Sequence, residues 1–277
     1  MTAPKEDVKP AEQPLAIRES RLQVLLNTEP VSKRFQQIMG KRAAAFMSSI
    51  ISAVAANDAL KTCDPMSVIS AAAVAAALDL PITPGLGFAH IVPYSGAAQF
   101  QIGWKGFVQL AMRTGQYKTM NHTAIYEGQL KKLDPFTGDM EFVEPRASEQ
   151  VIGYLFFFRL VNGFEKYFYM TKAECEAHGK RYSRSYKAGK GLWVDDFDAM
   201  ALKTVVKLGL SKYGVLSVEM QRAFEMDQAA IDENGQPQYI DAEAPATQPT
   251  TDATPKVSRV HQVIDAQAKA APPEAPI

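Results

Sequence analysis

The stretch VIGYLFFFRLVNGFEKYFYMTKAE, residues 151–174, decides the fold of this chain. Two runs rich in β-branched and aromatic residues, Val151–Leu160 and Phe164–Met170, flank the pair Asn162-Gly163. A two-residue hairpin turn needs a positive φ at its central positions, which Asn and Gly tolerate best. The stretch therefore predicts a β-hairpin.

The hairpin is followed at once by a helix signal. Thr171 and Glu174 have the spacing of a capping box, which predicts a short helix that ends near Gly179. Further on, apolar residues recur at helical spacing from Phe197 to Leu208, and Ser217–Ala229 predicts one more helix. The core stripe of the first of these two helices is predicted to contain Phe197, Met200, Ala201, Val205 and Leu208.

Upstream of residue 151, the sequence predicts a second hairpin and another strand. Phe88–Tyr94 and Ala98–Ile102 alternate around the turn pair Ser95-Gly96, and Gln116–Tyr126 has strand composition. Between them, a helix is predicted from Trp104, with an apolar stripe opposite a polar face. Its stripe contains Trp104, Phe107, Val108 and Ala111, and its polar face contains Lys105, Gln109 and Arg113.

The N-terminal third is predicted to be helical. Pro30 suits a first helical position, Ala43–Ala56 is an apolar run, and Asp64-Pro65 reads as an N-cap followed by the first helical residue. The helix that follows, Met66–Leu78, is almost entirely apolar or small, so it is buried within the monomer or against a neighbouring subunit. The sequence leaves both alternatives open.

Together these elements predict an α+β fold, a small antiparallel sheet with hairpins flanked by helices. We expect a disordered N-terminal tail at residues 1–21, a folded core at 22–229 and an acidic, mostly disordered tail at 230–277, because the flanks are rich in Pro, Ala, Gln and Thr. Val257, Val260 and Ile264 have helical spacing, which indicates either a partner-docking helix or an incidental apolar patch.

Neither a signal peptide nor a membrane span is expected, and two distant cysteines, Cys63 and Cys175, fit a reducing cytoplasm.

The net charge of zero hides an asymmetry. Residues 225–277 carry nine acidic and three basic side chains, a net charge of −6, so the preceding residues carry +6. A basic body suits a polyanionic partner.

The segment from His178 to Trp193, called the basic segment below, holds five cations, three aromatic residues and no acid. Cations neutralise phosphates, and aromatic faces stack unpaired bases, so the segment predicts contact with single-stranded DNA. The alternative is a solvated loop whose charges bind nothing specific. The candidate DNA-binding residues here are Lys180, Arg181, Tyr182, Arg184, Tyr186, Lys187, Lys190 and Trp193.

Two further sets of cations extend this predicted interface. Lys203 and Lys207 lie one turn apart, opposite the core stripe of their helix, and Lys212 follows them, so they predict one side of a basic groove. Lys105, Arg113 and Lys118, with Tyr117, predict another wall, although a solvated helix face would account for them equally.

Other chemistries are not indicated. No Gly-x-x-x-x-Gly-Lys-Ser/Thr motif occurs, so use of ATP is not expected. Asp195, Asp196 and Asp198 admit a metal-dependent nuclease as an alternative, but Asp195 and Asp198 are expected to cap the helix at residue 197. The four dispersed histidines predict no metal site or catalytic triad. A passive DNA-binding scaffold remains a second alternative.

Several of these stretches resemble the RecT family of phage and prophage single-strand annealing proteins. The resemblance rests on Gly85–Phe88 with its hairpin, Gln101–Phe107, Gly115–Lys118, and Trp193 with Asp198–Thr204. It places the basic segment and the Lys203 helix in the family's DNA-contacting region, and Lys105 less clearly. Leu202 departs from the family pattern, in which a cation is common.

The resemblance implies a non-enzymatic recombinase with a distantly Rad52-like core. Such a protein would coat single-stranded DNA as a ring or helical filament, anneal complementary strands to duplex without ATP, and act beside a 5′-to-3′ exonuclease in DNA recombination and repair. Magnesium would modulate annealing without a protein metal site. A host single-strand-binding protein is a candidate partner for the tail, and the bacterial cytoplasm is the expected compartment.

Overall fold

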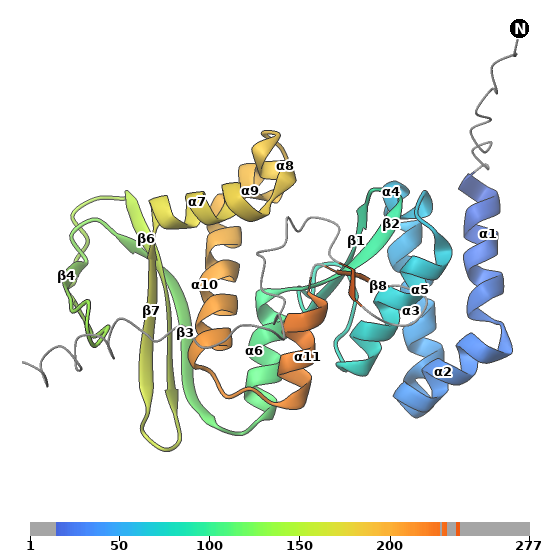
Figure 1. Ribbon diagram of the computed structural model, residues 1–277, viewed down its shortest axis with the longest axis horizontal. Helices are drawn as coiled ribbons and strands as arrows, with labels where there is room; N and C mark the ends of the chain where they lie inside the picture. The colour runs from blue at the N-terminus through green and yellow to red at the C-terminus, as the bar shows by residue number, and fades with distance from the viewer. Residues whose placement is uncertain (1–14, 228, 232–236, 239–277) are drawn as a thin grey trace, which may run out of the picture. The chain divides into compact units, whose positions relative to one another are not determined.

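A computed structural model describes residues 15–227, 229–231 and 237–238, all within the compact unit Met1–Asp241 (Figure 1). One antiparallel sheet has the order β3-β6-β7 and consists of β3 (Tyr117–Tyr126), β6 (Val151–Leu160) and β7 (Glu165–Thr171). The turn between β6 and β7 places Gly163 at a φ of 91°. The hairpin and the preceding strand are thus confirmed.

Alternation along β6 explains how this sheet is covered. Tyr154, Phe156 and Phe158 point to one face and are fully buried, whereas Arg159 is exposed. The helix α10 (Phe197–Tyr213) lies along the buried face, as Figure 1 shows. The packing is close, because a Cβ atom on Gly209 would lie 2.6 Å from the ring of Phe156.

A second sheet has the order β1-β2-β8-β9. Its predicted hairpin is confirmed as β1 (Ala89–Tyr94) and β2 (Ala97–Ile102), joined by Ser95 and Gly96 at φ values of 48° and 82°. The sequence did not predict β8 (Ala229–Ile231) or β9 (Pro237–Gln238). Because β8 pairs with β2, the chain returns to the first hairpin after its last helix.

The N-terminal part is helical, as predicted. Its described elements are α1 (Leu15–Leu26), α2 (Glu29–Met39), the 3-10 helix η1 (Gly40–Arg42), α3 (Ala43–Ala55), α4 (Asp58–Lys61) and α5 (Pro65–Ala77). The domain boundary predicted at residue 22 falls inside α1. Residues 1–14 and 239–277, including the predicted docking helix, lie outside the described residues.

Helix α5 is the centre of this helical part. Asp64 caps it by accepting a hydrogen bond from the amide of Ser67 at 3.0 Å, as the sequence predicted. Ile69, Ala71 and Ala72 are almost fully buried in the same core as residues of α1, α2, α3 and β2. Burial within the monomer is therefore the correct alternative for this helix.

Residues Glu29–Ala55 are long and apolar enough to cross a membrane by length and composition alone. In the structure this stretch is α2, η1 and α3. Phe35, Phe46 and Ile50 from it are buried in the protein core. These apolar side chains thus pack inside the protein.

The predicted helix at Trp104 is α6 (Trp104–Arg113), which packs against α10 and against α11 (Val218–Met226). Its first turn lies against the loop before β1. A Cβ atom on Gly103 would lie 2.1 Å from the carbonyl oxygen of Gly87, and one on Gly106 would lie 2.2 Å from that of Phe88. Only glycine allows these backbones to approach so closely.

Replacing Gly106 by alanine should lower the free energy of unfolding by about 1–3 kcal/mol, because the new methyl group collides with a backbone oxygen that cannot rotate away. The loss is expected even though alanine favours helices more than glycine does. Urea denaturation measures the change. Met112→Ala, at a position 52% exposed on the same helix, is the control and should change stability little.

The remaining elements surround the ends of the β3-β6-β7 sheet. A hairpin that the sequence did not predict, β4 (Leu130–Leu133) with β5 (Met140–Phe142), packs beside Ile125 and Leu155. The capping box of Thr171 and Glu174 starts α7 (Lys172–Tyr182), which is three residues longer than expected. Two short helices follow, α8 (Arg184–Lys187) and α9 (Leu192–Asp195). The predicted α+β fold is confirmed.

Candidate nucleic-acid interface

The basic segment is folded rather than a solvated loop. It consists of the last turn of α7, then α8 and α9. Ser183 caps α8 by accepting a hydrogen bond from the amide of Tyr186 at 3.2 Å. Gly189 and Gly191 have φ values of 70° and 85°, which glycine adopts without strain. The cations of the segment are therefore held by short helices at defined positions.

Two of its three aromatic residues form a scaffold. Trp193 is only 7% exposed, and its ring centre lies 5.6 Å from that of Tyr186 and 5.5 Å from that of Phe197. A Cβ atom on Gly179 would lie 2.9 Å from the Trp193 ring, so α7 packs directly on it. Base stacking by Trp193 is thus disfavoured, whereas Tyr182, 52% exposed, presents its ring to solvent.

The cations of the segment have different surroundings. Arg181, Lys187 and Lys190 are exposed. Lys180 pairs with Glu176 at 2.8 Å, an exposed pair one turn apart on α7 that adds little stability. Arg184 donates a hydrogen bond to the hydroxyl of Tyr94 at 3.4 Å. This bond joins α8 to β1, two segments about ninety residues apart in sequence.

Lys203 and Lys207 of α10 are not on an open face, contrary to the prediction. Lys207 forms an ion pair with Asp227 at 2.5 Å. The side chain of Asp227 is fully buried and also accepts a hydrogen bond from the amide of Ile102 at 2.9 Å. Lys203 is half-buried. The reason is that α10 is covered on a wide face by the sheet, α6 and α7, so residues opposite the predicted stripe are also enclosed.

The charges of Lys203 and Lys207 also act on two histidines, His90 on β1 and His178 on α7. We call His90, His178, Lys203 and Lys207 the central basic cluster. Partial burial lowers the pKa of His90, and the charge of Lys203 lowers it further. Burial also lowers the pKa of His178, with Lys207 and Arg181 adding to the effect. Both histidines therefore favour the neutral form.

Sequence reasoning did not find the two histidines of this cluster. They are far apart in the chain, and no local motif marks them. The pKa of Lys203 is also lowered, mainly by burial and in addition by Lys207, although Asp227 acts in the opposite direction. The cluster therefore depends on the fold and not on a local motif.

The residues predicted to form a second wall of the basic groove lie on different elements and have different surroundings. Lys105 is exposed at the start of α6, and its ammonium lies 5.8 Å from the ring centre of Trp104, which stacks at 4.2 Å on His122. Lys118 is exposed on β3. In the last turn of α10, Lys212 is exposed as well, with its ammonium 5.3 Å from the ring centre of Phe168.

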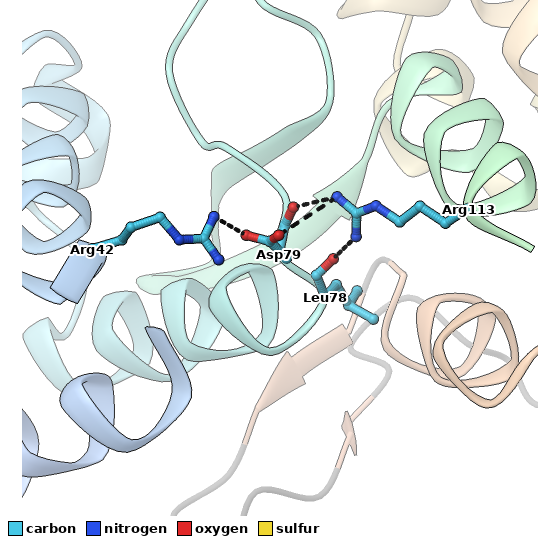
Figure 2. A network of polar contacts seen from close by, with 4 residues as sticks. All are labelled: Arg42, Leu78, Asp79 and Arg113. Carbon is cyan, nitrogen blue, oxygen red and sulfur yellow. Dashed lines mark hydrogen bonds and ion pairs between the residues drawn. The ribbon is translucent and has the colours of Figure 1, made fainter. Parts of the chain in front are cut away.

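Arg113 has a structural role. Its guanidinium donates hydrogen bonds of 2.7 Å to the carbonyl oxygens of Leu78 and Asp79, at the C-terminal end of α5 (Figure 2). The carboxylate of Asp79 also pairs with Arg42 at 2.7 Å. Figure 2 shows these two arginines on opposite sides of Asp79. Arg113 thus joins α6 to the end of α5.

The acidic residues that suggested a nuclease have other partners. Asp196, not Asp195, caps α10, accepting a hydrogen bond from the amide of Ala199 at 3.1 Å. Asp198 accepts a hydrogen bond from the hydroxyl of Tyr154. Among the residues that the structure describes, no three His, Cys, Asp or Glu side chains lie together so that they could hold a metal ion.

The fold and this surface define a class of protein. It is an α+β protein with a patch of exposed cations, and such patches are typical of proteins that bind polyanions. The chain belongs to the RecT family, which matches residues 44–243. It is 54% identical over 200 residues to the uncharacterized protein YqaK of Bacillus subtilis, covering 72% of this chain and 69% of that protein. It is 31% identical over 180 residues to Protein RecT of Escherichia coli, covering 61% of this chain and 65% of RecT.

The matched range contains both sheets, the basic segment and α10. The resemblance stated from the sequence is therefore confirmed. Membership in this family implies a role in single-strand annealing during recombination, and the family is one of annealing proteins rather than known catalysts.

Proposed function

We propose that this protein binds single-stranded DNA over the basic segment and the central basic cluster, and that it anneals complementary strands without ATP. The observation that carries the proposal is the set of exposed cations Arg181, Lys187 and Lys190 on a folded basic segment, which the hydrogen bond from Arg184 to Tyr94 joins to β1 of a RecT-family core. The cations of α7 and α8 are thereby held at defined positions beside β1.

This arrangement supplies what annealing needs. Two approaching phosphate backbones repel each other, and fixed cations reduce that repulsion. Base pairing then provides the free energy, about 1.4 kcal/mol for each base-pair step on average, so nucleotide hydrolysis is not required. Tyr182 provides an exposed ring on which an unpaired base can stack.

The exposed cations are the primary contacts in this proposal. They are Arg181, Lys187 and Lys190 on the basic segment, with Arg184, Lys105, Lys118 and Lys212 as further candidates. The bound form is an oligomer that coats the strand as a ring or filament in the bacterial cytoplasm. Magnesium acts on the DNA rather than at a protein site. A 5′-to-3′ exonuclease and, through residues 230–277, a host single-strand-binding protein are the proposed partners.

Replacing Arg181, Lys187 and Lys190 together by alanine should weaken binding of a labelled oligonucleotide and lower its salt dependence. Each lost phosphate contact on a single strand reduces the slope of log affinity against log salt by about 0.7, so the slope should fall by about 2. Fluorescence anisotropy at several salt concentrations measures this. Annealing of complementary oligonucleotides without ATP should slow in parallel.

The matched control removes three exposed cations elsewhere, Lys33, Arg34 and Lys41, which lie outside the residues matched to the family. An equal loss of affinity in the control variant would argue against a defined interface. Degradation of labelled strands by the wild-type protein with Mg²⁺ would instead favour a nuclease.

A further inference from the structure

The turn that joins β4 to β5 presents an aromatic ring to solvent. Phe136 lies in this turn and is 96% exposed. The turn itself is ordered, because the carboxylate of Asp134 accepts hydrogen bonds from the amides of Phe136 at 2.8 Å and Thr137 at 3.2 Å. The carbonyl oxygen of Asp134 also accepts a bond from the amide of Gly138 at 2.8 Å. The exposed ring is therefore held on a fixed backbone.

A groove lies between this turn, the strand β7 and the end of α10. Its lining includes Phe136, Lys166, Tyr167 and Tyr213. Lys166 joins β7 to the turn by donating a hydrogen bond of 2.8 Å to the carbonyl oxygen of Thr137. The volume of the groove is about 320 Å³, at the lower end of the ~300–1,000 Å³ typical of ligand-binding clefts. A single planar ring is a ligand of suitable size.

The groove combines aromatic rings with cations. The ammonium of Lys166 lies 5.2 Å from the ring centre of Tyr213, which is 43% exposed. The ammonium of Lys212 lies 5.3 Å from the ring centre of Phe168, which is 6.3 Å from that of Tyr213. Within the part of the chain that the structure describes, neither ammonium forms an ion pair with a carboxylate. Two positive charges thus lie beside the rings of this groove.

These features favour a nucleotide over a segment of protein. An apolar segment would cover the rings, but it would also remove water from two ammonium groups without giving them a partner. A nucleotide supplies both a planar base for the ring and a phosphate for the ammonium. Rings beside cations are the combination by which proteins hold single strands without reading their sequence. Lys212 is already a candidate contact for DNA, so the groove and the proposed interface share a residue.

We propose that an unpaired base of the bound single strand stacks on Phe136 in this groove, with its phosphate beside Lys212. The inference rests on the proposed function and adds a second stacking position to that of Tyr182. The two positions are separated by α10, because the basic segment packs on its first residue through Trp193 and the groove contains its last residue, Tyr213. A helix of 17 residues is about 25 Å long, which a strand with the ~3.4 Å spacing of stacked bases spans with about seven nucleotides.

The first experiment measures the anisotropy of a labelled oligothymidylate well above this length. Phe136→Ala should weaken binding about fivefold to a hundredfold, the range for one stacked base. Phe136→Leu should weaken it similarly, since leucine is apolar but has no planar face, whereas Phe136→Trp should keep the affinity. Because the side chain is 96% exposed, all three variants should keep the wild-type melting temperature. Lys212→Gln should lower the slope of log affinity against log salt by about 0.7.

The second experiment locates the base directly. A strand that contains iododeoxyuridine is irradiated on the full-length protein, which cross-links the base to an aromatic ring on which it stacks. Trypsin releases Phe136 in the peptide Leu133–Arg146. The cross-link should be found in this peptide for the wild type and should be absent from it in Phe136→Ala.

Phe164→Ala is the matched control, because Phe164 is another exposed phenylalanine in a hairpin turn, 45% exposed, and does not line the groove. This variant should bind DNA like the wild type. If Phe136→Leu binds as tightly as the wild type, or if Phe136→Ala changes the sedimentation of the free protein and not its affinity for DNA, the surface receives an apolar protein segment and the stacking position is overturned.

The fate of the stacking position is separable from that of the proposed function. If the wild type binds the oligonucleotide while Phe136→Ala keeps full affinity and no cross-link falls in Leu133–Arg146, the groove is not a DNA site and the proposed function stands. If the wild type binds no oligonucleotide at any salt concentration, the proposed function itself fails.

Discussion

Replacing Lys207 by methionine should lower the free energy of unfolding by about 3–5 kcal/mol, the range for breaking a buried ion pair from one side. The variant leaves the fully buried carboxylate of Asp227 without its cation. Methionine fills a similar volume, so the effect reports the lost charge rather than a cavity. Denaturant unfolding followed by circular dichroism measures the change.

A second substitution separates the ion pair from simple packing. In Lys207→Met/Asp227→Asn the buried carboxylate becomes a neutral amide, whose oxygen can still accept the hydrogen bond from Ile102. The double variant should therefore be more stable than Lys207→Met alone. If the two variants are equally unstable, the destabilisation does not come from the unpaired carboxylate.

Lys203→Met is the contrasting case on the same helix. The pKa of Lys203 is lowered in the folded protein, so the charged form opposes folding at neutral pH, and this penalty falls as pH rises from the folded pKa and is gone above the unfolded pKa. Removing the charge should leave stability unchanged or raise it. Two lysines one turn apart are thus expected to have opposite effects on stability, because Lys207 is paired with a buried carboxylate and the charge of Lys203 is opposed by burial.

Much of the fold could be predicted because its signals are local. Asn162-Gly163, Ser95-Gly96 and the capping box at Thr171 each specify backbone geometry within a few residues, and the structure has the expected element at every one. Asp64 likewise caps α5. The hairpin β4-β5 was missed because its strands are short and its apolar positions few.

The candidate interface was harder to predict, because its geometry depends on contacts between distant segments. The pairing of β8 with β2 brings Asp227 to Lys207, and nothing near either residue indicates this. Lys203 and Lys207 were therefore predicted to lie on an open face. A usable signal did exist in the glycines: Gly103 and Gly179 mark places where a backbone or ring approaches too closely for a side chain.

Replacing Trp193 by alanine should lower the free energy of unfolding by about 3–5 kcal/mol, as for other buried tryptophans. Trp193 is 7% exposed and packs against Gly179, Tyr186 and Phe197, so it joins α9 to α7 and to the start of α10. The cations of the basic segment depend on these helices for their positions. Affinity for single-stranded DNA should fall together with thermal stability.

Tyr182→Ala distinguishes a scaffold from a stacking platform. Tyr182 is 52% exposed, so its removal should leave the melting temperature nearly unchanged, while affinity for an oligonucleotide falls by the ~1–3 kcal/mol typical of one stacked base. Trp193→Ala that kept the wild-type melting temperature but lost affinity would show the opposite assignment. In that case Trp193 must leave its pocket on DNA binding, since the folded position of its ring gives a base no face to stack on.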